Sequence, residues 1–179
     1  SIVSPNITYV KSNFLKKINI GKKFLNYKNL ILLNLASIKN DGIMINYNLK
    51  NFRNVFKINV ESNFEISQIL LRQMIKNKWG RIINFSSSDG TKGDIGTVAY
   101  TSSKLAIHGI SKVISKEYAK FNVTSNVLLL GNFNFGMFSK LNNKKKKQLL
   151  NKVPSNKPGH IKNIFNAIDF LINSDYVNN

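Results

Sequence analysis

Apolar residues along this 179-residue chain follow two patterns that alternate along the sequence. Short, mostly apolar runs of strand length alternate with longer stretches in which apolar residues return every three or four positions, as in a helix. Nearly continuous apolar runs are typical of parallel strands covered on both faces. The pattern predicts strands at residues 7–10, 30–37, 81–85 and 123–131. It predicts helices at residues 14–25, 51–76 and 161–172, and a further helix that follows the glycine-punctuated loop at 89–96 and continues to about residue 121. This alternation indicates an α/β fold with a parallel sheet.

Three reactive side chains lie around the junction of one predicted strand and the next helix. Ser87 follows the apolar strand at residues 81–85, and a glycine-punctuated loop then leads to Tyr100 and Lys104. Tyr100 and Lys104 are four positions apart, which is about one helical turn. They therefore lie on the same face of the helix, within reach of one ligand.

These side chains have a definite chemistry when they lie together. A free tyrosine has a pKa near ~10, and a cation beside it stabilises the phenolate and lowers that pKa. Tyr100 is then suited to exchange a proton with a substrate oxygen, and the Ser87 hydroxyl can hold that oxygen in place. The set suits the interconversion of a carbonyl and an alcohol, given a hydride source.

The surroundings of Tyr100 are more specific than a Tyr-x-x-x-Lys spacing, which a lysine-rich chain produces by chance. A serine lies thirteen positions before Tyr100, a glycine loop separates the two, and Ser102-Ser103 precede the lysine. With these features the chain resembles the short-chain dehydrogenase/reductase family, whose catalytic Ser, Tyr and Lys match Ser87, Tyr100 and Lys104. The resemblance implies a Rossmann-like doubly wound parallel sheet and an NAD or NADP cofactor.

The resemblance also assigns roles outside this stretch. It places the family's fourth catalytic residue, an Asn that supports a proton relay, at Asn59, and it implies that Lys104 also holds the nicotinamide ribose. The remaining cofactor-binding positions would be Asn34, Ala36, Tyr100 and Gly131. The chain departs from the family pattern at Leu35 and Ser37, where the family has Asn and Gly. Phe135 stands where a Thr is expected to bind the nicotinamide, and Asn132 or Asn134 would have to substitute.

The family's opening strand, Gly-rich turn and helix, which hold the pyrophosphate, are not found in this sequence. The resemblance starts near the third strand of the fold and stops before the last. We therefore expect residues 1–179 to form a single Rossmann-type oxidoreductase domain that lacks its first two strands and its last strand. An internal fragment of a longer protein and a decayed gene are both compatible with this pattern. The residues that separate NAD from NADP would lie in the part not present.

The net charge is strongly positive, with 27 Lys and Arg against 8 Asp and Glu, a formal charge of +19. Such a charge attracts polyanions, but Lys, Asn and Ile are abundant throughout, as in proteins of AT-rich genomes. We expect no nucleic-acid or membrane partner. With no Cys and no apolar run of ~20 residues, a cytoplasmic protein is expected, and organelle targeting stays open. His108 and His160 have no partner at metal-binding spacing, so we expect them to be structural or exposed and expect no metal site.

Within the family, the segments around Trp79-Gly80-Arg81, Lys116-Glu117 and Val153-Pro154 are most similar to 3-oxoacyl-[acyl-carrier-protein] reductases of fatty-acid synthesis. Those enzymes dock an acidic carrier protein through basic residues, for which Lys78, Arg81 and Lys120 are candidates. The substrate would be a small-molecule or acyl-carrier-bound carbonyl. The helix at residues 51–76 is apolar on more than one face, which favours a homodimer or homotetramer built through the two long helices. The alternative is a catalytically inactive family member that acts as a basic binding or scaffold protein.

Overall fold

The protein, seen here in a computed structural model, is described at residues 12–16, 18, 20 and 27–179. Within these residues the sheet has three parallel strands in the order β1-β2-β3, formed by β1(Ile31–Asn34), β2(Gly80–Ser87) and β3(Val123–Leu130). The predicted strands at 81–85 and 123–131 are confirmed. The strand predicted at 30–37 is shorter, because the chain leaves the sheet after Asn34. The strand predicted at 7–10 lies outside the described residues.

The described helices include the predicted ones, with similar bounds, and two short helices that were not predicted: one at Asp89–Lys92, in the segment predicted as a glycine-punctuated loop, and one at Asn143–Leu150. They are α1(Leu49–Phe56), α2(Ser62–Asn77), α3(Asp89–Lys92), α4(Val98–Tyr118), α5(Asn143–Leu150) and α6(Ile161–Asn173). The helix predicted at 51–76 is continuous from α1 to α2, but a π-helical turn, η3(Lys57–Glu61), joins the two parts. A 3₁₀ turn at Ala119–Phe121 ends the helix predicted to reach residue 121. None of these helices is long and apolar enough to cross a membrane.

The helix predicted at 14–25 is wrong over its described residues 14–16, 18 and 20. Residues 14 and 15 form a turn instead. Leu15 N–H donates to the Asn13 side chain at 3.0 Å, and Lys16 N–H donates to the Asn13 carbonyl at 2.9 Å. An Asn side chain that bonds the backbone two residues on stabilises a turn at the expense of a helix.

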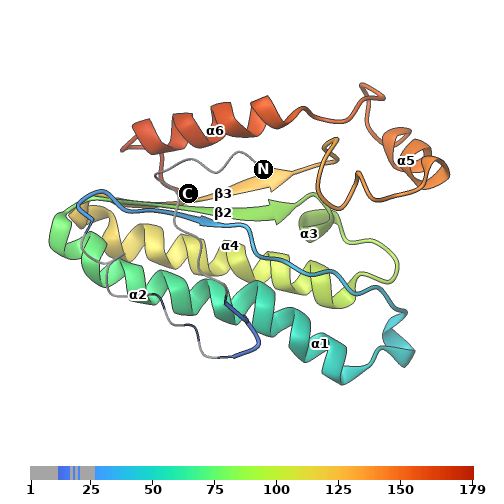
Figure 1. Cartoon of the computed structure of the whole chain (residues 1–179), viewed down its shortest axis with the longest axis horizontal. Coiled ribbons are helices and arrows are strands. Elements are labelled where there is room, and N and C mark those ends of the chain that lie inside the picture. Colours follow the sequence, from blue (N-terminus) through green and yellow to red (C-terminus); the bar gives the residue numbers. More distant parts are fainter. Residues whose placement is uncertain (1–11, 17, 19, 21–26) are drawn as a thin grey trace.

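The sheet lies between two layers of helices (Figure 1). Helices α2 and α4 cover one face, with α1 beside α4, and α6 covers the other face. Helices α3 and α5 lie beyond the carboxyl ends of the strands. An apolar core lies on each face of the sheet. Strand β2 contributes to both cores, because its successive side chains point to opposite faces. Ile82 packs against α2 and α4, with Met74 and Ile114, and Ile83 and Phe85 pack against α6. Both faces of β2 are therefore buried, as a nearly continuous apolar run requires.

Polar side chains also cross the interior, next to the α2 and α4 core. The Asn84 side-chain oxygen, on β2, accepts hydrogen bonds from Asn34 at 2.9 Å and from Asn63 at 3.0 Å. Its amide group donates to the Ser125 hydroxyl at 3.5 Å, and Ser125 shares a 2.9 Å bond with Ser111 of α4. Asn84 is fully buried, so these bonds replace the water that it loses on folding. We call Asn34, Asn63, Asn84, Ser111 and Ser125 the polar seam.

Candidate active site

The predicted catalytic serine, tyrosine and lysine lie around the carboxyl end of β2 and the first turns of α4. Ser87 is the last residue of β2, and Tyr100 and Lys104 stand at the third and seventh positions of α4. The Lys104 ammonium donates a 2.7 Å hydrogen bond to the carbonyl oxygen of Phe85, two residues before Ser87. Because α4 runs back along the sheet from this point, the turn with Tyr100 lies beside the end of β2. The fold therefore brings these predicted residues to one place.

Lys104 is a buried cation, with 6% of its surface exposed. Burial disfavours the charged ammonium and lowers the pKa of Lys104 from 10.5 to about 8. Gly90, after β2, lies against the same side chain, because a Cβ at Gly90 would come within 2.7 Å of the Lys104 Cβ. A residue without a side chain is thus needed where the backbone passes the lysine.

Tyr100 is buried to the same degree, with 4% of its surface exposed, and two ammonium groups lie over its ring. The Lys104 nitrogen is 5.6 Å from the ring centroid, and the Lys39 nitrogen is also at 5.6 Å. Lys104 was expected from the sequence. Lys39 was not, because it is far from Tyr100 in the sequence and matches no part of the motif that identified the site.

Asn59 joins the loop after β1 to α4. Its side-chain oxygen accepts from the Ile38 N–H at 2.8 Å, and its amide group donates to the Ile38 carbonyl and to the Ser103 hydroxyl, both at 3.0 Å. Ser103 in turn donates to the Tyr100 carbonyl oxygen at 2.7 Å. Asn59, in the π-helical turn, therefore reaches the turn of α4 that carries Tyr100 through Ser103.

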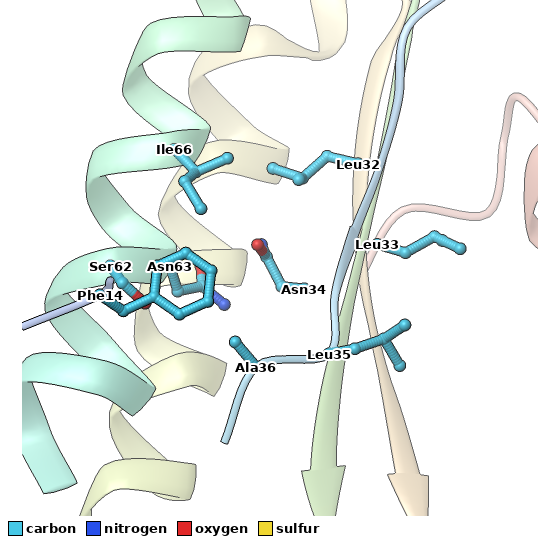
Figure 2. Close-up of a pocket in the computed structure, with 9 residues that line it drawn as sticks. All are labelled: Phe14, Leu32, Leu33, Asn34, Leu35, Ala36, Ser62, Asn63 and Ile66. Atoms are coloured by element: carbon cyan, nitrogen blue, oxygen red, sulfur yellow. The ribbon is translucent and has the colours of Figure 1, made fainter. Parts of the chain in front are cut away.

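The predicted cofactor-binding residues of β1 border an open hollow of about 300 Å³ (Figure 2). Asn34 and Ala36 point from the end of β1 toward Ser62 and Asn63 at the start of α2, whereas Leu35 points to the other side of the sheet. The Asn34 amide group is already bonded to Asn84 in the polar seam. Asn34 thus supports the sheet at the edge of the hollow.

Gly131 directly follows β3, so the predicted cofactor residues lie along one edge of the sheet, at the carboxyl ends of β1, β2 and β3. Open α/β sheets bind ligands at this edge. Phe135, at the position of the expected Thr, packs against Phe133 with ring centroids 5.8 Å apart and offers no hydrogen bond. Asn132 and Asn134 join their backbones to Gly159 instead.

The prediction that Arg81 docks an acidic carrier protein is wrong. Arg81 is 3% exposed, and its guanidinium donates to the carbonyls of Ile172, Gly80 and Asn122. It holds α6 against the start of β2 and is not available to a partner. Lys78 and Lys120 precede β2 and β3, so they lie at the opposite end of the sheet from Ser87 and do not flank the site within one chain.

His108, expected to be structural or exposed, has a structural contact at the end of β2. Its Nε2 atom shares a 2.9 Å hydrogen bond with the Ser86 hydroxyl, next to Ser87. Burial and the nearby Lys112 ammonium lower the pKa of His108, so its neutral form is favoured. His108 lies four positions after Lys104, on the same face of α4. His160 caps α6 by accepting from Lys162 N–H, which is the structural role expected of it.

Comparison with known proteins decides the family. The model of the family described as short chain dehydrogenase matches residues 23–146, more than half of the chain. The chain belongs to the short-chain dehydrogenase family. The family is as the sequence motifs predicted, and the three parallel strands with helices on both faces agree with its fold.

Several curated members of the short-chain dehydrogenase family are similar over most of this chain. A 3-oxoacyl-[acyl-carrier-protein] reductase of Aquifex aeolicus is 33% identical over 167 residues, which cover 90% of this chain and 67% of the relative. The same enzyme from Buchnera aphidicola subsp. Baizongia pistaciae is 35% identical, over 83% of this chain and 62% of the relative. A nodulation protein G of a Rhizobium species is 30% identical. The chain spans 59% to 67% of the length of these three relatives.

Solved structures of dehydrogenases share the fold. A gluconate 5-dehydrogenase from Burkholderia cenocepacia, in complex with NADP and tartrate, superposes with a TM-score of 0.77 at 23% identity. It covers 83% of this chain, and the match takes in 60% of that protein. A second protein, from Beutenbergia cavernae, superposes with a TM-score of 0.81 at 20% identity, covering 88% of this chain and 65% of its own. At these identities the likeness concerns the fold alone.

Proposed function

We propose that this chain carries the catalytic part of an NAD(P)-dependent oxidoreductase that interconverts a carbonyl and an alcohol. The observation that carries the proposal is the position of Tyr100 and Lys104, both buried and on one face of α4, beside the strand end that bears Ser87. A buried tyrosine next to a buried ammonium is suited to proton transfer at a substrate oxygen.

In carbonyl reduction the Tyr100 hydroxyl protonates the substrate oxygen, and the Ser87 hydroxyl positions that oxygen by a hydrogen bond. The Lys104 ammonium stabilises the phenolate that remains. Asn59 supports the proton relay and fixes Ser103 under the Tyr100 carbonyl. The Phe85 carbonyl holds Lys104 in the orientation that this requires, since the 2.7 Å bond fixes its nitrogen.

The residues present fit the nicotinamide half of the cofactor. An ammonium has three N–H donors, and within the described residues Lys104 uses one of them on Phe85, so donors remain for the ribose hydroxyls. Asn34, Ala36 and Gly131 line the same sheet edge. When bound, the nicotinamide supplies the hydride that the carbonyl carbon needs. A Gly-rich pyrophosphate turn is not part of this sequence.

For the substrate we propose a 3-oxoacyl thioester on an acyl carrier protein, in fatty-acid synthesis. The similarity to the two reductases supports it. So does the charge of the segment between Gly131 and Lys162, which has eight lysines and no acidic residue. Helix α5, in this segment, lies beyond the strand ends near the site (Figure 1), and Lys152 contacts Asp94 of the loop before α4 at 3.9 Å. A positive surface at the entrance favours an acidic carrier.

The test is nicotinamide oxidation by the full-length protein, followed by absorbance, with an acetoacetyl thioester offered free and on its carrier. Both should be reduced, and Tyr100→Phe should lower kcat at least about 100-fold with an unchanged circular dichroism spectrum. Rising salt should increase KM for the carrier-bound substrate and leave the free thioester unaffected. Equal salt dependence would contradict the carrier. If the intact protein neither binds nor oxidises the cofactor, the reductase proposal fails and the basic scaffold becomes the better explanation.

For the assembly we propose a homodimer or homotetramer built through the long helices α2 and α4. Leu105 and Val113 on α4 and Phe64 on α2 are about half exposed. Between the first two lies Gly109, where a Cβ would meet nothing within 4 Å. Glycine inside a helix costs about 1 kcal/mol relative to alanine. Close approach of the backbone of a second copy of α4 would explain a glycine at this position.

A further inference from the structure

Lys39 lies in the loop that follows β1 and brings a second positive charge to Tyr100. Its nitrogen is 5.6 Å from the centroid of the Tyr100 ring, the same distance as that of Lys104. The two lysines approach the ring from different elements, one from α4 and one from the loop. The proposed mechanism requires only the Lys104 cation, so the second one needs an explanation.

The loop is fixed on both sides of Lys39. Asn59 binds both the N–H and the carbonyl of Ile38, at 2.8 and 3.0 Å. The Tyr47 hydroxyl donates to the Asn40 carbonyl at 2.8 Å, and the Gly42 N–H donates to the Gly96 carbonyl at 2.8 Å. With its two neighbours in the sequence held by these bonds, Lys39 has its backbone fixed relative to Tyr100. Its position over the ring is therefore a property of the fold.

The two cations differ in their surroundings. Burial lowers the pKa of Lys104 to about 8, so Lys104 loses its charge in the alkaline range where a tyrosine begins to ionise. The Lys39 side chain keeps 29% of its surface exposed, and its nitrogen is 3.5 Å from an Asp41 carboxylate oxygen. Lys39 therefore lies partly at the surface in an ion pair, whereas Lys104 is buried.

We propose that Lys39 is a positioning residue that acts through Tyr100, by stabilising its phenolate alongside Lys104. The proposal rests on the proposed function, in which Tyr100 exchanges the proton. Within the described side chains, the charged groups on the loop after β1, at the end of α3 and in the loop before α4 are Lys39, Asp41, Lys92 and Asp94, and Lys104 lies on α4. Asp94 contacts Lys152, and Asp41 contacts Lys39. Removing Lys39 leaves Asp41 without this cation and makes the phenolate harder to form.

The experiment is a titration of the Tyr100 phenolate by near-ultraviolet absorbance in the full-length protein. The signal of Tyr100 is obtained as the difference between each protein and the same protein with Tyr100→Phe. Lys39→Met should move the midpoint about one pH unit higher. Lys39→Arg should keep it near the unmodified value, because arginine restores the charge. Lys50→Met removes an exposed lysine of α1 as a matched control and should leave the midpoint unchanged.

The outcomes separate this inference from the proposed function. An unchanged midpoint in Lys39→Met, with a native circular dichroism spectrum, would overturn the role of Lys39 even if the protein reduces carbonyls. That role is equally refuted if Tyr100 of the unmodified protein does not ionise below the pH of unfolding. A shifted midpoint without turnover of any substrate would leave Lys39 coupled to Tyr100 and refute the reductase instead. In an active protein, the acid limb of the pH profile for alcohol oxidation should move by the same amount in Lys39→Met.

Discussion

Burying the polar side chains of the site costs free energy of folding, and hydrogen bonds offset part of that cost. A buried ammonium such as Lys104 loses its hydration, and one hydrogen bond to the Phe85 carbonyl replaces only part of it. Asn59 is buried as well, but its side chain has partners for both its oxygen and its amide group. Burial therefore lowers the pKa of Lys104, whereas the fully bonded Asn59 side chain links the loop after β1 to α4.

The cost of burying Lys104 should be visible in the pH dependence of stability. Its pKa is about 8 in the fold and 10.5 in an unfolded chain, so between these values the unfolded state binds more protons. The free energy of unfolding should therefore rise with pH across that window, by about 3 kcal/mol from this group. The measurement is chemical denaturation at several pH values, for the unmodified protein and Lys104→Met. Subtracting the two curves removes other titrating groups, and a difference that is flat from pH 8 to 10.5 would contradict the assignment.

The element that organises the chain is β2, because its alternating side chains support two cores and the polar seam. Ile82 and Asn84 face α2 and α4, and Ile83 and Phe85 face α6. The strand then ends at Ser87, and its neighbours β1 and β3 end along the same edge. The register of β2 therefore sets both the packing of the sheet and the position of the site.

Asn84→Val should destabilise the fold strongly although it places a β-branched residue in a strand. Without the Asn84 oxygen, the amide groups of Asn34 and Asn63 lose their acceptor, at a cost of about 2–4 kcal/mol. Thr124→Val in β3 is the matched control, since the buried Thr124 hydroxyl has no hydrogen-bond partner among the described residues. Its replacement should be neutral or stabilising. Urea denaturation measures both, and equal costs would show that the polar seam contributes nothing specific.

At the scale of the whole molecule, the layer formed by α1, α2 and α4 has an outer face that points away from the sheet. This outer face is exposed and partly apolar in the single chain. Helices α1 and α4 contact each other, and α2 continues from α1, so their outer faces are adjacent (Figure 1). The net charge of +19 repels copies of the chain from one another. Association through this surface must therefore rest on apolar burial and close helix contact, with little help from charge.

Gly109→Trp should convert the proposed oligomer into a monomer, because an indole on α4 keeps the two backbones apart. Gln148→Trp on the exposed face of α5 adds the same ring elsewhere and should leave the assembly intact. Molar mass by light scattering after size-exclusion chromatography distinguishes the states. If Gly109→Trp has the mass of the unmodified protein, any oligomer uses another surface.

The sequence by itself determined most of the strands and helices, the family, and the residues expected at the site. The periodicity of apolar residues is a local property, and the motif from Ser87 to Lys104 lies within one strand, loop and helix. The secondary structure and the motif can therefore be predicted without knowledge of the tertiary structure. Only the tertiary structure decided which distant residues meet. Lys39 comes to the site because the carboxyl end of β1 lies beside that of β2, and Asn59, expected there from the resemblance, does so because its π-helical turn packs on α4. Asn84 is buried at the centre of the polar seam, whose residues come from several elements. Likewise, Arg81 is buried and holds α6 by a hydrogen bond, because the fold and not the residue type determines which side chains are exposed.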